Sequence, residues 1–119
     1  MKQRHRLRRK ADFQSAIQGR RFHSGQALVG FAVQAETGQP RVGVTVSRAI
    51  KTSVDRNRAK RRLREVSRQR FLSPDSPLAA LGIRYDVVLI ARPAALEVSF
   101  ADLAAEASLA ALRLSKLNS

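Results

Sequence analysis

Eight lysines and arginines lie in the stretch SVDRNRAKRRLREVSRQR, residues 53–70, against only two acidic side chains. Their guanidinium and ammonium groups can bind phosphates, and each guanidinium can donate to two phosphate oxygens at once. Like charges at this density repel one another, so an isolated domain gains no stability from them. The stretch therefore suggests a surface that binds a polyanion.

The charge of the whole chain supports this interpretation. Its 119 residues carry a net charge of +14, and the excess lies in two blocks, residues 1–21 at +7 and residues 41–72 at +9. A solvated surface of mixed charge explains such a one-signed concentration poorly. Nucleic acid is the leading candidate for the partner, and an anionic membrane surface is the weaker one.

Side chains suited to catalysis or metal binding are sparse. The chain has no cysteine, which excludes thiol catalysis and fits a cytoplasmic location. His5 and His23 have no partners at metal-binding spacing, and we expect them to be exposed or to lie near phosphate. The acids are scattered, no phosphate-binding glycine motif occurs, and no apolar run is long enough to cross a membrane. We therefore expect a binding protein with no catalytic side chain, no small-molecule substrate and no membrane partner.

The apolar pattern predicts an α+β fold, a two-layer sandwich of a mixed sheet and helices, in a single domain over residues 1–119 with residues 1–10 as a flexible basic leader. The expected order is helix, strand, strand, helix, strand, helix, at residues 11–18, 27–35, 41–48, 53–71, 85–92 and 99–117. A short link predicts that the first two strands form an antiparallel hairpin, and the strand–helix–strand segment predicts one parallel pair. The last strand is apolar almost throughout, which is typical of a central strand.

Both long helices carry a readable pattern. In the basic helix, Ala59, Leu63 and Val66 form an apolar stripe when projected at about 100° per residue. The opposite side is polar and almost purely cationic, with Asn57, Arg61, Arg64 and Arg68. The last helix begins with Ser99 and Asp102 at the spacing of a capping box. Its residues expected to face inward are Phe100, Leu103, Ala107, Ala110 and Leu114.

The segment VSRAIKTSVDRNRAKRRLRE, residues 46–65, strongly resembles the signature of the protein subunit of bacterial-type ribonuclease P. In that family a strand ending in Val-Ser-Lys/Arg leads into Arg-Asn-Arg-x-Lys-Arg-x-x-Arg-Glu. RLRRKADFQ, residues 6–14, and YDVVLIARP, residues 85–93, resemble the family's N-terminal segment and last strand. The resemblance therefore covers nearly the whole chain in the same order.

The resemblance implies a fold like domain 2 of ribosomal protein S5, with a left-handed β-α-β crossover against the usual right-handed rule. It implies a protein that joins a catalytic RNA, helps it remove the 5′ leader of precursor tRNA, and lowers its Mg²⁺ requirement. The RNA would hold most of the Mg²⁺ and perform the chemistry. The leader would bind in a cleft between the first helix and the sheet, and the basic helix would pack on the catalytic RNA.

Individual roles follow residue by residue from the same resemblance. The basic signature implies RNA binding by Arg56, Asn57, Arg58, Lys60, Arg61 and Arg64, to which Arg68 is added because it shares the cationic face. Phe13 matches the aromatic residue of the cleft, where it would stack on an unpaired base, and the alternative is a core phenylalanine. Phe31 stands where relatives often have tyrosine, and Ile17 stands where some have a second phenylalanine. No residue is identified as a metal ligand.

Two other functions are compatible with the residues alone. The chain can be a structural RNA-binding protein of the ribosomal type, and co-purification with ribosomal subunits would favour that function. A nuclease that acts without an RNA subunit is the third hypothesis, and cleavage of precursor tRNA by the purified chain would support it.

Overall fold

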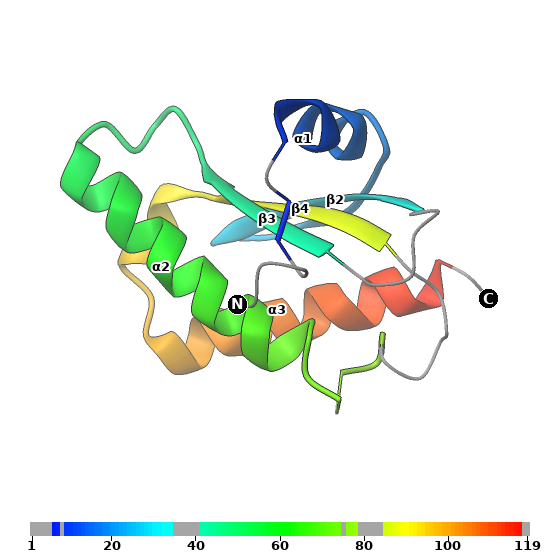
Figure 1. The fold of residues 1–119 in the computed structure, drawn as a ribbon. Helices are drawn as coiled ribbons and strands as arrows, with labels where there is room; N and C mark the ends of the chain where they lie inside the picture. Colours follow the sequence, from blue (N-terminus) through cyan, green and yellow to red (C-terminus); the bar gives the residue numbers. More distant parts are fainter. Residues whose placement is uncertain (1–5, 8, 35–40, 75, 79–84, 118–119) are drawn as a thin grey trace.

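Four strands in the order β1-β2-β4-β3 form the centre of the protein, and helices cover both faces of the sheet (Figure 1). The computed structural model describes residues 6–7, 9–34, 41–74, 76–78 and 85–117. Its elements are α1 (Lys10–Ile17), β1 (Arg20–Ser24), β2 (Leu28–Gln34), β3 (Arg41–Val46), α2 (Ser53–Arg70), β4 (Tyr85–Ala91), the 3-10 helix η2 (Pro93–Leu96) and α3 (Phe100–Lys116). The predicted α+β class and mixed sheet are confirmed.

β4 lies at the centre of the sheet, antiparallel to β2 and parallel to β3. The predicted hairpin between β2 and β3 is therefore wrong, because β4 separates these strands. The physical reason is the apolar run of β4. Val88 faces α1 while Val87 and Leu89 face the other helices, and all three are at most 1% exposed. A strand with two apolar faces leaves the least apolar surface exposed to water when both faces are covered, as they are at the centre of the sheet.

The crossover from β3 through α2 to β4 is left-handed. In Figure 1, β3 lies in front of β4, both strands run from right to left, and α2 returns below the sheet. The hand agrees with the resemblance and departs from the right-handed rule. One consequence is that α2 and α3 lie together on one face of the sheet, while α1 lies on the other.

β1 is a strand that the sequence pattern does not predict. Its pairing with β2 shifts register between Arg21 and His23, so that Phe22 and His23 are both buried instead of alternating. Such a bulge removes the period-two pattern by which a strand is recognised. Phe22 packs on Gly30, where a Cβ atom would lie 2.5 Å from its ring.

The predicted stripe of α2 is confirmed, since Ala59, Leu63 and Val66 have no exposed surface. In α3, the Ser99 hydroxyl accepts a hydrogen bond from the Asp102 amide at 3.0 Å, as the capping-box spacing predicts. Four of the five residues expected to face inward in α3 are buried. Phe100 is the exception at 37% exposed, and fully buried Ala95 of η2 lies instead at this end of the core.

His23 is buried at 3% exposure, so the expectation of an exposed or phosphate-bound histidine is wrong. Its Nδ1 lies 2.9 Å from Nη1 of Arg113, which can only donate, so Nδ1 accepts and the Nε2 proton is directed at Glu106, 2.9 Å away. Glu106 also accepts hydrogen bonds from the backbone amides of Ala27 and Leu28. The network joins β1 and the start of β2 to α3. His5 lies outside the described residues.

Replacing Glu106 with alanine should lower the free energy of unfolding by about 2–4 kcal/mol, because His23 and two backbone amides lose their acceptor in a largely buried place. Urea unfolding of the free chain measures this loss. Glu97→Ala removes an exposed carboxylate from the neighbouring segment and should change stability by less than about 0.5 kcal/mol. Equal losses for the two variants would contradict the role given to the network.

Candidate nucleic-acid interface

The arginines of α2 separate into two groups according to what their guanidinium groups contact. Three bind backbone carbonyl oxygens of neighbouring segments. Nη1 of Arg56 donates to Ile50 at 2.9 Å and to Ser47 at 3.3 Å. Arg58 donates to Leu96 at 3.1 Å, and Arg62 donates to Val98 at 2.6 Å.

These contacts connect α2 to the loop before it, to the end of η2 and to the segment between η2 and α3. Arg56 and Arg58 belong to the predicted RNA-binding set, so the structure gives both of them a structural contact within the chain. A guanidinium has five N–H donors, and one or two carbonyl acceptors leave donors for a phosphate. The backbone contacts hold the side chains of Arg56 and Arg58 in place, unlike side chains that project into solvent without such contacts.

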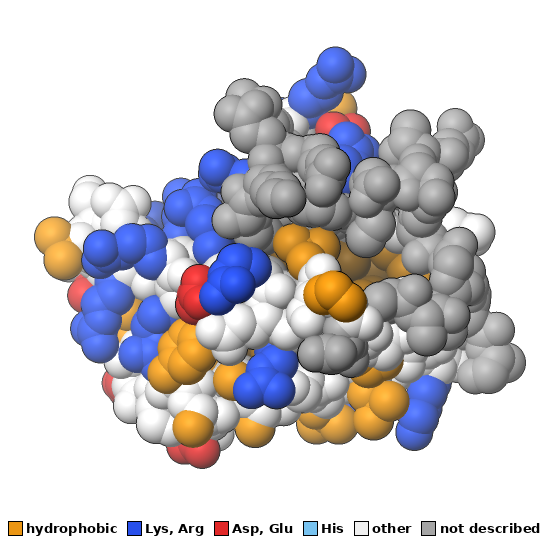
Figure 2. Space-filling view, turned by 60° about the horizontal axis from the view of Figure 1, so that its bottom comes forward, with side chains coloured by type: hydrophobic (Ala, Val, Ile, Leu, Met, Phe, Trp, Pro, Cys, Tyr) orange, Lys and Arg blue, Asp and Glu red, His pale blue; other side chains and the backbone are white. Residues whose placement is uncertain are grey.

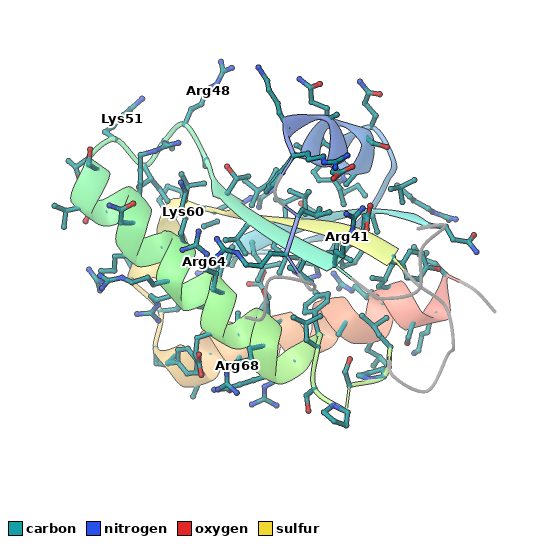
Figure 3. The ribbon with its side chains drawn as sticks, in the orientation of Figure 1. Arg41, Arg48, Lys51, Lys60, Arg64 and Arg68 are labelled. Carbon is teal, nitrogen blue, oxygen red and sulfur yellow. The ribbon has the colours of Figure 1, made fainter. Side chains whose placement is uncertain are left out.

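The remaining predicted residues project from α2 on its flank and on the side opposite its buried stripe. Asn57, Arg61 and Arg68 are exposed, and Lys60 and Arg64 are half-buried. Figure 3 shows Lys60, Arg64 and Arg68 following one another along the helix. The structure thus brings these five side chains onto one rigid surface, which we call the α2 basic face.

The acidic residue Glu65, which ends the basic signature, lies next to the α2 basic face and contacts Arg68. Its carboxylate accepts hydrogen bonds from Arg68 at 2.5 Å and from Gln69 at 2.9 Å. The bond from Arg68 is the main cause that lowers the pKa of Glu65 from its ordinary value, and it raises the pKa of Arg68. Arg68 is therefore partly neutralised, unlike its neighbours on the face.

Two further cationic residues extend this surface. They are not among the RNA-binding residues predicted from the sequence. Arg48 and Lys51 are exposed in the loop between β3 and α2, and Figure 3 shows both side chains pointing away from the loop. The signal that identifies Arg48 is the Val-Ser-Arg sequence at the end of β3, which stands within the family signature. Figure 2 shows Lys and Arg side chains gathered over the α2 side of the molecule.

Arg41, at the start of β3, has a different environment. It forms a two-pronged ion pair with Asp86, with Nε–Oδ1 at 2.9 Å and Nη2–Oδ2 at 2.6 Å, and lies 3.6 Å from Asp12 of α1. The hydrogen bonds that Arg41 donates to the Asp86 carboxylate are the main cause that raises the pKa of Arg41. Arg41 thus ties β3 to β4 and α1, and its charge is already compensated.

Both predicted cleft aromatics lie on the sheet face that α1 covers. Strand alternation places Phe31 on the same face as Val33, opposite to the buried Leu28 and Ala32 that face α2 and α3. Phe13 packs against the small cluster beneath α1. Phe31 and Phe13 are both half-buried, and Ile17 of α1 is 40% exposed. This face is therefore covered only in part.

Gly43 of β3 allows Phe13 to reach the sheet. A Cβ atom at this position would lie 2.5 Å from Cζ of Phe13 and 3.0 Å from Cβ of Leu7. The glycine is needed because the phenyl ring lies directly on the strand. Phe13 thus packs between α1 and β3 while part of its surface stays exposed.

No group of three or more His, Asp and Glu residues suited to a metal ion occurs among the described residues. Within the same residues, no helix is long and apolar enough to cross a membrane. The described surface offers cations and aromatic rings, which are the groups that bind phosphates and unpaired bases.

The comparisons with known proteins agree with each other. The family model described as Ribonuclease P matches residues 1–115. The Ribonuclease P protein component of Acidothermus cellulolyticus is 37% identical over 105 residues, which cover 87% of this chain and 82% of that protein. The component of Nocardioides sp. is 39% identical over 114 residues, covering 92% and 91%.

Two solved structures show the same fold. The RNase P protein of Staphylococcus aureus superposes with a TM-score of 0.71 at 23% identity, covering 94% of this chain and 95% of that one. The RNase P protein from Thermotoga maritima gives a TM-score of 0.66 at 24% identity, covering 85% and 89%.

Arg56→Ala should lower the free energy of unfolding by about 1–2 kcal/mol, because two backbone carbonyls lose a charged donor. Arg61→Ala removes the same side chain from an exposed position of the same helix and should change stability by less than about 0.5 kcal/mol. Urea unfolding of both variants measures the difference. Indistinguishable midpoints would show that the contacts of Arg56 do not support the fold.

Proposed function

The chain belongs to the ribonuclease P protein family, and we propose that it binds a catalytic RNA through the α2 basic face and the 5′ leader of precursor tRNA on the sheet face beside α1. It acts as the protein component of ribonuclease P. In this proposal the RNA subunit performs the cleavage that removes the leader.

The observation that carries the proposal is the construction of α2. Three apolar residues with no exposed surface fix one side of this helix to the core, and the other side presents cations. A fixed helix loses little conformational freedom when it binds, so its cations meet phosphates at a small entropic cost. A disordered basic tail would lose its conformational freedom on binding, so its entropic cost would be larger.

The partly covered sheet face suits the leader, which is single-stranded. Phe13 and Phe31 offer rings on which unpaired bases can stack, and stacking accepts any base because every base has a π-face. Contacts to the phosphate backbone likewise carry no sequence information. We therefore expect the protein to show little preference among leader sequences.

In this proposal the RNA subunit holds most of the Mg²⁺. Two phosphate-rich strands repel each other, and both divalent cations and protein cations can reduce this repulsion. Cations of the protein placed between the leader and the RNA would replace part of the Mg²⁺ otherwise needed. We name no protein ligand for a metal ion.

A structural role in the ribosome is the alternative that the residues alone allow. It is not favoured, because the family match extends over residues 1–115 and includes the segments outside the basic helix. A basic helix by itself would not have distinguished the two functions.

Reconstitution with the cognate RNA subunit tests the proposal. Adding the protein should lower the Mg²⁺ concentration that gives half-maximal cleavage of a leader-bearing precursor tRNA. The protein alone should not cleave this substrate. An unchanged Mg²⁺ requirement would contradict the proposed role, and cleavage by the RNA-free protein would contradict the assignment of the chemistry to the RNA.

Arg61→Ala should weaken binding to the RNA subunit and reduce the slope of log K against log salt by up to about one, because one phosphate contact is lost. Arg70→Ala is the matched control, since Arg70 is an exposed arginine of α2 that lies toward Pro77 and α3. Filter binding at several salt concentrations gives both slopes. If Arg70→Ala reduced the RNA affinity and the salt slope as much as Arg61→Ala, the α2 basic face would not be the contact surface.

Phe31→Ala should reduce the preference for leader-bearing over mature tRNA by about fivefold or more, the equivalent of one lost stacking contact of about 1–3 kcal/mol. Phe31→Tyr keeps the ring and should keep the preference. Phe100→Ala removes a phenylalanine from α3, on the other face of the sheet, and should have no effect. Equal preference in the wild type and the Phe31→Ala variant would remove Phe31 from the leader site.

A further inference from the structure

Arg6 and Leu7 lie along the open edge of β3, and Arg6 thereby comes close to α2 although it is distant in sequence. Arg6 forms an isolated parallel bridge with Val42, and the amide of Leu7 donates to the Val42 carbonyl at 3.2 Å. Leu7 is 5% exposed and anchors this segment. The side chain of Arg6 thereby shares a cavity with Arg64, 58 positions later in the chain.

Arg6 is close enough to Arg64 to perturb its guanidinium. Burial, and after it the charge of Arg6, lower the pKa of the Arg64 guanidinium from its ordinary value. Arginine nevertheless stays charged at neutral pH. Nε of Arg64 is buried and has no hydrogen-bond partner among the residues that the structure describes. The fold therefore holds two like charges together and leaves a buried donor unused, and both features cost stability.

No carboxylate compensates this pair in the described part of the chain. Glu65, the nearest acid in sequence to Arg64, is engaged by Arg68 and Gln69. Asp12 and Asp86 form salt bridges with Arg41 of β3. None of the salt bridges among the described residues involves Arg6 or Arg64.

The cavity between the two arginines has a volume of about 50 Å³. Its other lining residues come from the Arg6 segment, α1 and β3, and they are Leu7, Phe13, Val42, Gly43 and Val44. A space of this size admits a compact group and is too small for a base. It lies where the α2 basic face meets the sheet face that carries Phe13.

We propose that Arg6 and Arg64 together bind one phosphate group of an RNA backbone in this cavity. The anion would accept hydrogen bonds from both guanidiniums, including the unused Nε of Arg64, and would remove their mutual repulsion. The inference rests on the proposed RNA-binding function and adds a defined site and a residue, Arg6, outside the basic signature. The phosphate can belong to the leader or to the RNA subunit, because the cavity lies between the two surfaces.

A double-mutant cycle with Arg6→Gln and Arg64→Gln tests this inference in the full-length chain. If both arginines bind one phosphate, each single variant should bind RNA about tenfold more weakly, as expected for loss of a charge-assisted hydrogen bond. The double variant should then lose little more than either single variant. Arg61→Gln combined with Arg6→Gln is the control, and these two losses should multiply because Arg61 lies on the exposed side of α2.

Two binding measurements identify the source of the phosphate. Weaker binding to the RNA subunit assigns the phosphate to that RNA. Unchanged binding to the RNA subunit, with weaker binding of leader-bearing tRNA by the assembled complex, assigns it to the leader. Single-variant losses that simply multiply in the double variant, or no loss in either measurement, would overturn the shared site. Failure of the wild-type chain to bind RNA at all would instead contradict the proposed function.

The free protein supplies an independent test. Titration with inorganic phosphate should shift the Nε–H resonance of Arg64 in the wild type and not in the Arg6→Gln variant. The urea midpoint of Arg6→Gln should equal or exceed that of the wild type, because the repulsion is removed while the backbone bridge to Val42 remains. A lower midpoint together with an unchanged phosphate shift would show that Arg6 is only structural.

Discussion

The structure depends on the burial of a narrow apolar stripe on a helix that is otherwise basic. Leu63, Val66 and Ala59 have no exposed surface, and buried Ser67 donates its hydroxyl to the Leu63 carbonyl at 2.7 Å. Burial of one leucine or valine contributes about 1.5–3 kcal/mol, whereas a like-charge pair on a helix costs a few tenths. The core can therefore hold α2 in place although its cations repel each other, and the remaining repulsion favours a polyanionic partner.

Arginine has two uses in this arrangement. Arg56, Arg58 and Arg62 donate to backbone carbonyls and fix the segments around α2. Arg61 and Arg64 have no such partner among the described residues and face outward or into the cavity beside β3. The first group fixes the helix from which the second group projects. In the proposed function, the second group then meets RNA, so the basic signature would specify both a fold and a binding surface.

The sequence predicts what depends on a short pattern. The buried stripe of α2, the Ser99 cap of α3 and the apolar β4 were all readable because their determinants lie within one element. The apolar run of β4 indicates a central strand, but which strands it separates depends on competition between strands, which no local pattern records. The bulge in β1 hides its alternation, and buried His23 depends on Glu106 and Arg113, which lie more than 80 residues away. The site shows the same limit: the basic face was predicted from one helix, whereas the meeting of Arg6 with Arg64 depends on tertiary structure.

In the proposed complex, α2 faces the RNA subunit, the sheet face beside α1 faces the leader, and α3 faces neither. The chain contains no cysteine, so a hydroxyl-radical probe can be attached at one introduced cysteine at a time. Tethered cleavage of the assembled complex is the most direct measurement. The account predicts cuts in the RNA subunit from Asn57→Cys, cuts in the leader from Ile17→Cys, and few cuts from Leu109→Cys on α3. Stronger cleavage of either RNA from position 109 than from positions 57 and 17 would contradict it.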